Sequence, residues 1–435
     1  MKNIRYYVFW GLDLLKGGPI KKHYQEIKTL MDSGDISKWQ QEKITSLLDT
    51  ASRHCRFYKG YDKYKSLNEC PVIDKTTIKE HYEQFISEQY EKNSLHKMST
   101  SGSTGTPFEI LQNQDKRTRV LAELIYYNET AGQYVGDKFI FYRVWTDKNK
   151  KSKMEQIKQN LLPIDILHLD DNNLKYITDI LLKDKKVNST LAYASTYDCL
   201  LQYLRKNKIK GNFHVKSMIS SSELLLDETR DGLEEIIGCK VINRYSNQEC
   251  GVLAQSNLKE NKMIINKASY FIEVLKVDAD EPAEEGELGR IIVTDLFNYA
   301  MPLIRYDTGD LGIVSKNSSD AGYHFDNIQG RRVDIIYDTK GDSLTPHTWS
   351  VYMWKFNQLK QYQFIQEGEK EYTLKVNGAE GIYTEKELSQ TLQDVLGRDA
   401  QINIDHVEEI PVLASGKFKK TICNYKKGEN IVSNK

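Results

Sequence analysis

The 435-residue sequence lacks most of the features that would assign it to a specialised class. It holds only 8 prolines and 6 cysteines, with no Cys-x-x-Cys pair and no cysteine–histidine cluster at zinc spacing. No apolar run reaches the roughly 18 residues that span a bilayer. Lys plus Arg and Asp plus Glu both number 61, so no excess charge favours nucleic acid. We expect a cytoplasmic protein of two or three domains with reduced thiols.

The N-terminal segment carries apolar residues at helical spacing, and Gly17-Gly18 ends the run. Asp13 lies inside the run and no small-residue cleavage site follows, so a secretory signal is not expected. The pattern leaves two interpretations open. One is an amphipathic helix docked on the protein, and the other is a peripheral contact with the inner membrane surface.

Further along the chain, the pattern of apolar residues changes twice. Residues 1–95 look helical, and strands then alternate with helices up to residue 246, which predicts βαβ units. From about residue 264 the chain is rich in strands and punctuated by glycine, which predicts a barrel-like sheet. We therefore expect an α/β fold with a large domain over residues 1–333 and a small α+β domain over residues 334–435.

The segment STSGSTGTP, residues 99–107, is the most informative part of the chain. Its glycines allow a close approach of the backbone, and consecutive amides in such a turn form a concavity that binds anions such as nucleotide phosphates. It is not a Walker A loop, because no Gly-Lys-Ser/Thr follows. A flexible linker is the plainer alternative. The density of hydroxyl groups and the apolar FEIL directly after the loop favour the phosphate site.

Polar clusters follow this loop in a fixed order. Each taken alone fits a turn or a solvated loop, but their order is difficult to assign to chance. They are SSSE (220–223), RYSNQE (244–249), YDTGD (306–310), GRRVD (330–334) and ASGKFKK (414–420).

This series of motifs resembles the adenylate-forming superfamily of acyl-CoA synthetases and adenylation domains. Within it, the chain is similar to the phenylacetate-CoA ligase family and to its capsular polysaccharide biosynthesis, or CapK-like, branch. The resemblance covers nearly the whole chain, and the phosphate loop and PLIRYDTGD (302–310) are its most specific parts.

The resemblance implies an enzyme that uses ATP and Mg²⁺ to activate a carboxylic acid as an acyl-adenylate, releasing pyrophosphate. The acyl group would pass to coenzyme A or to another thiol or amine acceptor, such as a carrier protein or an amino sugar, in surface or capsular polysaccharide biosynthesis. A second hypothesis is a catalytically silent nucleotide-binding scaffold for polysaccharide assembly. The presence of Lys417, Glu249 and the phosphate loop favours the enzyme.

The resemblance also implies a role for each matching residue. Lys417 would be the catalytic cation, Glu249 would hold Mg²⁺, and Asp310 would bind the ribose hydroxyls. The other expected ATP ligands are Ser101, Gly102, Ser103, Thr104 and Gly105 at the phosphates, Ser222, Glu223, Arg244 and Tyr245 in the adenine pocket, Ser246 beside them, and Arg331 near the ribose.

Two motifs depart from the family pattern. Val333 stands where the hinge of the family has its first acidic residue, and only Asp334 remains. The segment RYSNQE replaces the commoner Tyr-Gly-x-Thr-Glu. We expect the small domain to rotate between the two half-reactions, with a pivot shifted toward Asp334 because a β-branched valine is stiff.

Overall fold

The computed structural model describes most of the chain. The described residues are 2–61, 66–100, 108–145, 150–167, 169–223, 225–277, 279–316, 323–329, 336–344, 352–356, 359, 361–378, 381, 383–410 and 421–425. All six cysteines lie within them and none forms a disulfide, as expected. Within these ranges, no helix combines the length and the apolar character required to cross a bilayer.

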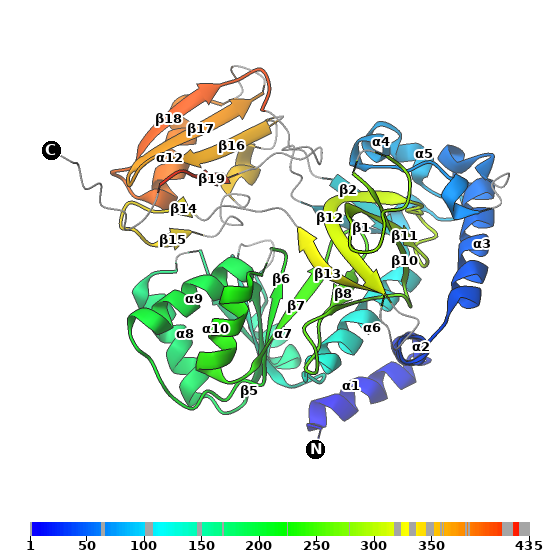
Figure 1. Ribbon diagram of the computed structural model, residues 1–435, viewed down its shortest axis with the longest axis horizontal. Helices are drawn as coiled ribbons and strands as arrows, with labels where there is room; N and C mark the ends of the chain where they lie inside the picture. Colours follow the sequence, from blue (N-terminus) through cyan, green and yellow to red (C-terminus); the bar gives the residue numbers. More distant parts are fainter. Residues whose placement is uncertain are drawn as a thin grey trace.

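The N-terminal part is helical, as the sequence predicts (Figure 1). Its helices are α1 (Ile4–Leu15), α2 (Pro19–Asp32), α3 (Ser37–His54), α4 (Lys75–Glu80) and α5 (Tyr82–Phe85). The carboxylate of Asp13 accepts hydrogen bonds from the first amides of α2, at Ile20 (3.2 Å) and Lys21 (2.9 Å). This contact satisfies amides that have no partner inside the helix and fixes α1 against α2.

Next comes a two-stranded hairpin that is separate from the other sheets. Its strands are β1 (His96–Thr100) and β2 (Phe108–Gln112), and Thr100 pairs with Phe108. The expected phosphate loop joins these two strands, and its residues 101–107 lie outside the described part of the chain. Helix α6 (Gln114–Thr130) follows β2 directly.

An 11-stranded sheet forms the centre of the large part, in the order β10-β11-β12-β13-β9-β8-β7-β6-β5-β3-β4. Its parallel half confirms the predicted βαβ units. The elements of that half are β3 (Lys138–Arg143), α7 (Lys153–Gln159), β4 (Leu161–Asp165), α8 (Asp171–Lys183), β5 (Val187–Tyr193), α9 (Ala194–Lys206), β6 (Ser217–Ser221), α10 (Asp227–Ile237) and β7 (Lys240–Ser246).

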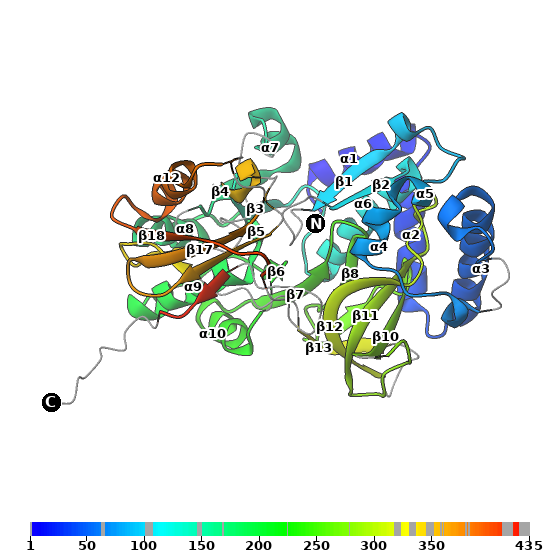
Figure 2. The same cartoon turned by 90° about the horizontal axis from the view of Figure 1, so that it is seen from above.

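The antiparallel half continues the same sheet, because β7 pairs with β8. Its strands are β8 (Val252–Gln255), β9 (Met263–Ile265), β10 (Tyr270–Lys276), β11 (Leu288–Asp295), β12 (Tyr306–Lys316) and β13 (Tyr323–Gln329). Figure 2 shows this half curved, as expected of a barrel-like sheet. The sequence patterns did not predict β4, β8 or β13. Pro163 within β4 explains the first omission, since proline is tolerated only at a sheet edge, where β4 lies.

The C-terminal part has its own sheet of four strands, in the order β18-β17-β16-β19. The predicted hairpin is β16 (Gln361–Gln366) with β17 (Glu371–Asn377), and α12 (Glu385–Leu396), β18 (Gln401–His406) and β19 (Thr421–Cys423) complete the unit. A small pair, β14 (Ile336–Tyr337) and β15 (Ser343–Leu344), precedes it. Figure 1 shows this sheet apart from the larger one. The domain division at residues 333 and 334 falls outside the described residues and stays a prediction.

Separate hydrophobic cores stabilise these parts. Helices α8, α9 and α10 cover the parallel half and bury residues such as Leu200, Leu204 and Leu233. Leu374 and Leu392 lie in the core of the C-terminal unit. Burying each such side chain contributes roughly 1.5–3 kcal/mol, so each sheet forms a rigid base for the loops at its edge.

Candidate active site

Two of the predicted clusters meet at the carboxyl edge of the parallel half. Strands β6 and β7 are parallel neighbours, so they end side by side. The Oγ atoms of Ser221 and Ser246, the last residues of these strands, lie 3.3 Å apart. Crevices at this edge are the usual ligand sites of open α/β sheets.

Ser222 and Glu223 extend this edge beyond β6. Ser222 is exposed and has a φ of +73°, a left-handed conformation that few non-glycine residues adopt. The Glu223 carboxylate accepts a hydrogen bond of 2.9 Å from the amide of Ser195 near the start of α9. Burial raises the pKa of the Glu223 carboxyl above its ordinary value, and the bonds from Ser195 offset only part of this. Backbone strain and a perturbed carboxyl at one place are typical of a ligand site.

Tyr245 connects the parallel half to β12. Its hydroxyl donates to Oδ2 of Asp310 at 2.9 Å and lies 3.3 Å from Oγ1 of Thr308. Burial, followed by the charge of Asp310, raises the pKa of Tyr245 well above its ordinary value, so the phenol stays protonated and donates. The structure therefore brings together two predicted ATP ligands that are distant in the sequence.

Glu249 lies in the loop after β7 with only 3% of its surface exposed. Its Oε1 is 2.7 Å from Nζ of Lys75 and accepts a hydrogen bond of 3.1 Å from the hydroxyl of Tyr306. Burial alone would raise the pKa of the Glu249 carboxyl, but the ion pair with Lys75 and the other hydrogen bonds lower it. The carboxylate is therefore charged although it is buried.

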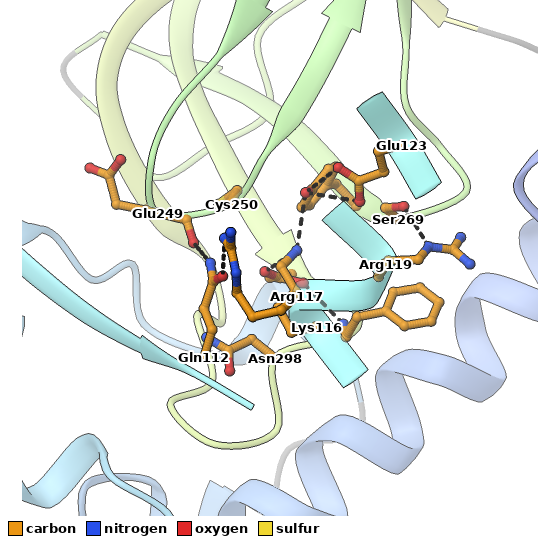
Figure 3. A network of polar contacts seen from close by, with 12 residues as sticks. Gln112, Lys116, Arg117, Arg119, Glu123, Glu249, Cys250, Ser269 and Asn298 are labelled. Carbon is orange, nitrogen blue, oxygen red and sulfur yellow. Dashed lines mark hydrogen bonds and ion pairs between the residues drawn. The ribbon is translucent and has the colours of Figure 1, made fainter. Parts of the chain in front are cut away.

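The β1–β2 hairpin reaches Glu249 at two points. Phe108, the first described residue after the predicted phosphate loop, stacks on Tyr306 with ring centres 6.3 Å apart. Nζ of Lys75 lies 5.3 Å from the centre of the same Phe108 ring. At the other end of β2, the side-chain amide of Gln112 donates through Nε2 to the backbone carbonyl of Glu249 at 2.9 Å (Figure 3). The exit of the loop is thus held beside the buried carboxylate.

A buried polar network fixes α6 behind this site (Figure 3). Nζ of Lys116 lies 2.7 Å from Asp295, and both side chains are fully buried. The same Nζ donates to Tyr270 at 3.0 Å, and Tyr270 donates to Glu123 at 3.0 Å. Because buried charges are tolerated only when they are paired, this network ties α6 firmly to the antiparallel half.

Arg244 is a predicted ligand whose hydrogen bonds go to residues outside the predicted site. Its guanidinium is buried and donates to Gln255 (2.5 Å) and Asn128 (2.7 Å). Burial lowers its pKa to about 10. Successive strand residues point to opposite faces, so Arg244 and its neighbour Tyr245 diverge. Its role in the adenine pocket stays a prediction without support from these contacts.

The remaining predicted ligands fall outside the described residues. They are Ser101, Gly102, Ser103, Thr104, Gly105, Arg331 and Lys417, the expected catalytic cation, together with the expected hinge residues Arg332, Val333 and Asp334. Their roles stay predictions.

Lys75, Phe108 and Gln112 lie at the candidate site, and the motifs did not predict them. The Asp74 side chain accepts from the amide of Thr77 at 2.7 Å, which is a readable helix start and places Lys75 in the first turn of α4. That local signal does not disclose the partner of Lys75, because Glu249 is distant in the sequence.

The donor set at Glu249 fits Mg²⁺ brought in by a nucleotide. Mg²⁺ commonly uses one or two carboxylates together with phosphate oxygens. In the described part of the chain, no group of three or more His, Cys, Asp or Glu side chains could hold a metal ion by itself. A single buried, charged carboxylate next to the exit of a phosphate-type loop therefore suits a metal that arrives with its phosphates.

The chain is similar in sequence to known proteins. The family described as CapK C-terminal domain matches residues 336–424. Protein CapK of Staphylococcus aureus is 26% identical over 445 residues, covering 96% of this chain and 95% of that protein. A phenylacetate-coenzyme A ligase of Thermus thermophilus is 23% identical over 322 residues, covering 68% of this chain and 70% of the ligase.

A solved structure shows that the fold is shared. The structure of 2-hydroxyisobutyryl-CoA ligase with 2-HIB-AMP and CoA has a TM-score of 0.61 and 17% identity, covering 91% of each chain. In sequence, the chain is therefore similar to CapK along nearly its whole length and to a phenylacetate-CoA ligase along about two thirds of it, and it shares the fold of 2-hydroxyisobutyryl-CoA ligase.

Proposed function

We propose that this chain is an ATP-dependent acid ligase that converts a carboxylic acid to its acyl-adenylate and then passes the acyl group to a thiol or amine. The coarser part of this proposal, an adenylate-forming ligase, rests on the similarity to CapK and the phenylacetate-CoA ligases and on the shared fold. The finer part concerns the acceptor and the biological role. We assign coenzyme A, a carrier protein or an amino sugar as acceptor, in cytoplasmic steps of surface or capsular polysaccharide synthesis.

The observation that carries the proposal is the position of β2. Phe108 packs against both Tyr306 and Lys75, and each of these contacts Glu249. An ATP molecule whose phosphates lie in the loop at residues 101–105 would therefore present them beside the Glu249 carboxylate. Phosphates and carboxylate together supply the oxygen ligands that Mg²⁺ requires. When bound, the metal would neutralise part of the phosphate charge.

The other half of the site would hold the nucleoside. Asp310, oriented by Tyr245, would accept hydrogen bonds from the ribose hydroxyls. Ser222, Glu223 and Ser246 lie at the ends of β6 and β7, where an adenine ring would extend along the sheet edge. Arg331 would complete the ribose side.

In the first half-reaction, an oxygen of the substrate carboxylate attacks the α-phosphorus of ATP and the bond to pyrophosphate breaks. Negative charge grows on the phosphate oxygens, and Lys417 from the small domain would stabilise it. In the second, the acceptor thiol or amine attacks the acyl carbon, gives up a proton, and AMP leaves. The first step would need Lys417 beside the reacting carboxylate and phosphate, whereas the second would need the acceptor thiol or amine there.

We therefore also propose that residues 1–333 and 334–435 act as two bodies that rotate about residues 332–334. The related 2-hydroxyisobutyryl-CoA ligase has been solved in open, postadenylation and thioesterification states. Val333→Pro would fix one backbone angle of the pivot. It should impair one half-reaction far more than the other.

Pyrophosphate exchange tests the proposal directly. The protein is incubated with ATP, Mg²⁺, labelled pyrophosphate and one acid at a time from a panel of amino acids, aryl acids, short hydroxy acids and uronic sugars. At least one acid should drive label into ATP, and Lys417→Ala should slow that exchange about 100- to 1,000-fold. Nucleotide binding without exchange for any acid would favour the silent scaffold instead.

A further inference from the structure

Helix α1 presents an apolar face to solvent. Six of the 14 exposed large hydrophobic residues in the described part of the chain lie on this one helix. They are Ile4, Tyr7, Val8, Leu12, Leu14 and Leu15. Ile4 is 78% exposed and Leu15 is 84% exposed. With Gly11, these residues follow one another around a broad arc of the helix that contains no charged side chain.

The opposite side of α1 is firmly docked. Trp10 packs on Tyr24 of α2 with ring centres 5.5 Å apart, and Phe9 packs in the same cluster. Asp13, only 4% exposed, caps α2, and the Asn3 side chain accepts from the amide of Tyr6 to cap α1 itself. The helix therefore has a fixed orientation, and its apolar face points away from the core. Contiguous exposed apolar surface of this kind marks an interaction site.

The charged side chains of α1 and of the start of α2 are mostly basic. Residues 2–25 contain five basic side chains, at Lys2, Arg5, Lys16, Lys21 and Lys22. The only acidic residue in the same stretch is the buried Asp13. This contrasts with the whole chain, in which 61 basic and 61 acidic residues balance. Arg5 and Lys16 are exposed and border the apolar arc on the same side, one at each end of the helix.

We propose that α1 lies in the plane of an anionic lipid surface, with its apolar face in the acyl boundary and Arg5, Lys16 and Lys22 at the headgroups. A helix with one apolar face and a cationic border is the pattern of interfacial binding, and its side chains would enter to a depth of roughly 5–10 Å. A second copy of the chain fits less well. An isologous contact between two α1 helices would oppose Arg5 and Lys16 with the same cations of the other copy.

The proposed surface does not obstruct the candidate site. Figure 1 shows α1 at the lower edge of the molecule and the four-stranded sheet β18-β17-β16-β19 at its upper left. A protein bound through α1 would keep the β1–β2 hairpin and the C-terminal unit accessible. Lipid binding and catalysis can therefore be measured independently.

The test is flotation of the full-length protein with vesicles, one set of phosphatidylcholine and one of phosphatidylcholine mixed with phosphatidylglycerol. Wild type should float with the mixed vesicles and largely fail to float with pure phosphatidylcholine. Val8→Glu with Leu12→Glu should reduce the bound fraction at least about tenfold, because charges replace the inserted side chains. Arg5→Gln with Lys16→Gln should reduce binding several-fold and make it less sensitive to salt.

The matched control is Ile157→Glu with Leu226→Glu, which alters two exposed apolar residues outside α1. It should float like wild type, and equal melting temperatures of all variants show that folding is intact. Failure of wild type to float with anionic vesicles overturns the proposal, as does unchanged flotation of the Val8→Glu, Leu12→Glu variant. Sedimentation that shows a dimer lost in that variant, without lipid binding, assigns the face to a second copy.

Discussion

Nζ of Lys75 lies 2.7 Å from Oε1 of Glu249, which joins the first turn of α4 to the loop after β7. The carboxylate is 3% exposed at its side chain and the lysine 29%, so the pair is largely shielded from water. A cation already neutralises the carboxylate proposed to hold Mg²⁺. A nucleotide-bound metal would have to share the Glu249 carboxylate with Lys75 or displace the Lys75 ammonium group from it.

Lys75→Met is expected to leave the Glu249 charge buried without its ion-pair partner and to lower the free energy of unfolding by about 3–5 kcal/mol. Mg²⁺ with ATP should then raise the melting temperature of the variant more than that of wild type, since the metal supplies the missing positive charge. Thermal unfolding with and without Mg²⁺ and ATP measures both effects. Lys97→Met is the control, because Lys97 pairs with Glu109 at the surface, and should cost less than about 1 kcal/mol.

Glu249→Gln is expected to raise the Mg²⁺ concentration for half-maximal pyrophosphate exchange and to lower turnover, because an amide oxygen is a weaker ligand than a carboxylate. Tyr306→Phe serves as the comparison, since it removes one hydrogen bond to Glu249 but retains the carboxylate. An unaltered Mg²⁺ titration in Glu249→Gln would contradict the assigned role.

Asp310→Ala is expected to weaken binding of both ATP and AMP by about 1.5–3 kcal/mol, the value of hydrogen bonds to a charged group. Calorimetric titration with each nucleotide measures it. Asp280→Ala, an exposed residue paired with Arg290, should bind both normally. A soaked crystal with the ribose far from Asp310 would remove the assignment.

Lys417→Ala is expected to slow adenylate formation about 100- to 1,000-fold, the scale of removing one preorganised donor in a transition state. ATP affinity should change little, because the lysine acts on charge that develops during reaction. Single-turnover release of pyrophosphate reports the chemical step. Lys419→Ala, in the same segment, controls for general loss of positive charge, and wild-type rates in Lys417→Ala would refute the role.

Glu223→Gln is expected to stabilise the protein at neutral pH. Burial raises the pKa of Glu223 above 4.5, so the folded state holds a proton more tightly than the unfolded chain. Wild type therefore loses stability as pH rises from about 4.5 through the folded-state pKa, and the amide avoids that loss. Apparent melting temperatures should be higher for the variant at neutral pH and equal at about pH 4.

Glu155→Gln provides a control of opposite sign for that experiment. Hydrogen bonds from Ser152 lower the pKa of Glu155, so its charged form stabilises the folded state above pH 4.5. This variant should be less stable than wild type at neutral pH, with a difference that vanishes in acid. The same direction of change in both variants would contradict the assignment for Glu223.

The sequence predicted elements whose pattern is local and strongly periodic. Helices α9 and α12 and the β16–β17 hairpin lie where spacing and turn residues indicate, because each is stabilised by its own amphipathic face. Strand β13 was not predicted, since it is defined by pairing with β12 and β9. Strand pairing depends on partners that the local pattern does not reveal.

The candidate site likewise has features that the sequence indicates and features that only the structure gives. The motifs indicated Glu249, Tyr245 and Asp310 as site residues, and the structure adds the contacts that each of them makes. Sequence order did not distinguish Tyr245 from Arg244, which faces Asn128 and Gln255 instead. A motif specifies the residue type, whereas the face of the strand and a tertiary partner decide what the side chain binds.

Strand β7 belongs to both halves of the large sheet, through its pairing with β6 and β8. Ser246 and the partner pair Tyr245 and Asp310 therefore sit on one continuous hydrogen-bonded body, while the β1–β2 hairpin pairs with no other strand in the described ranges. The base and the sugar of a nucleotide would therefore bind to residues whose relative positions are fixed by one sheet. The phosphates would bind at the β1–β2 hairpin, which side-chain contacts hold in place. Substitutions in that hairpin could change phosphate binding without changing which nucleoside is accepted.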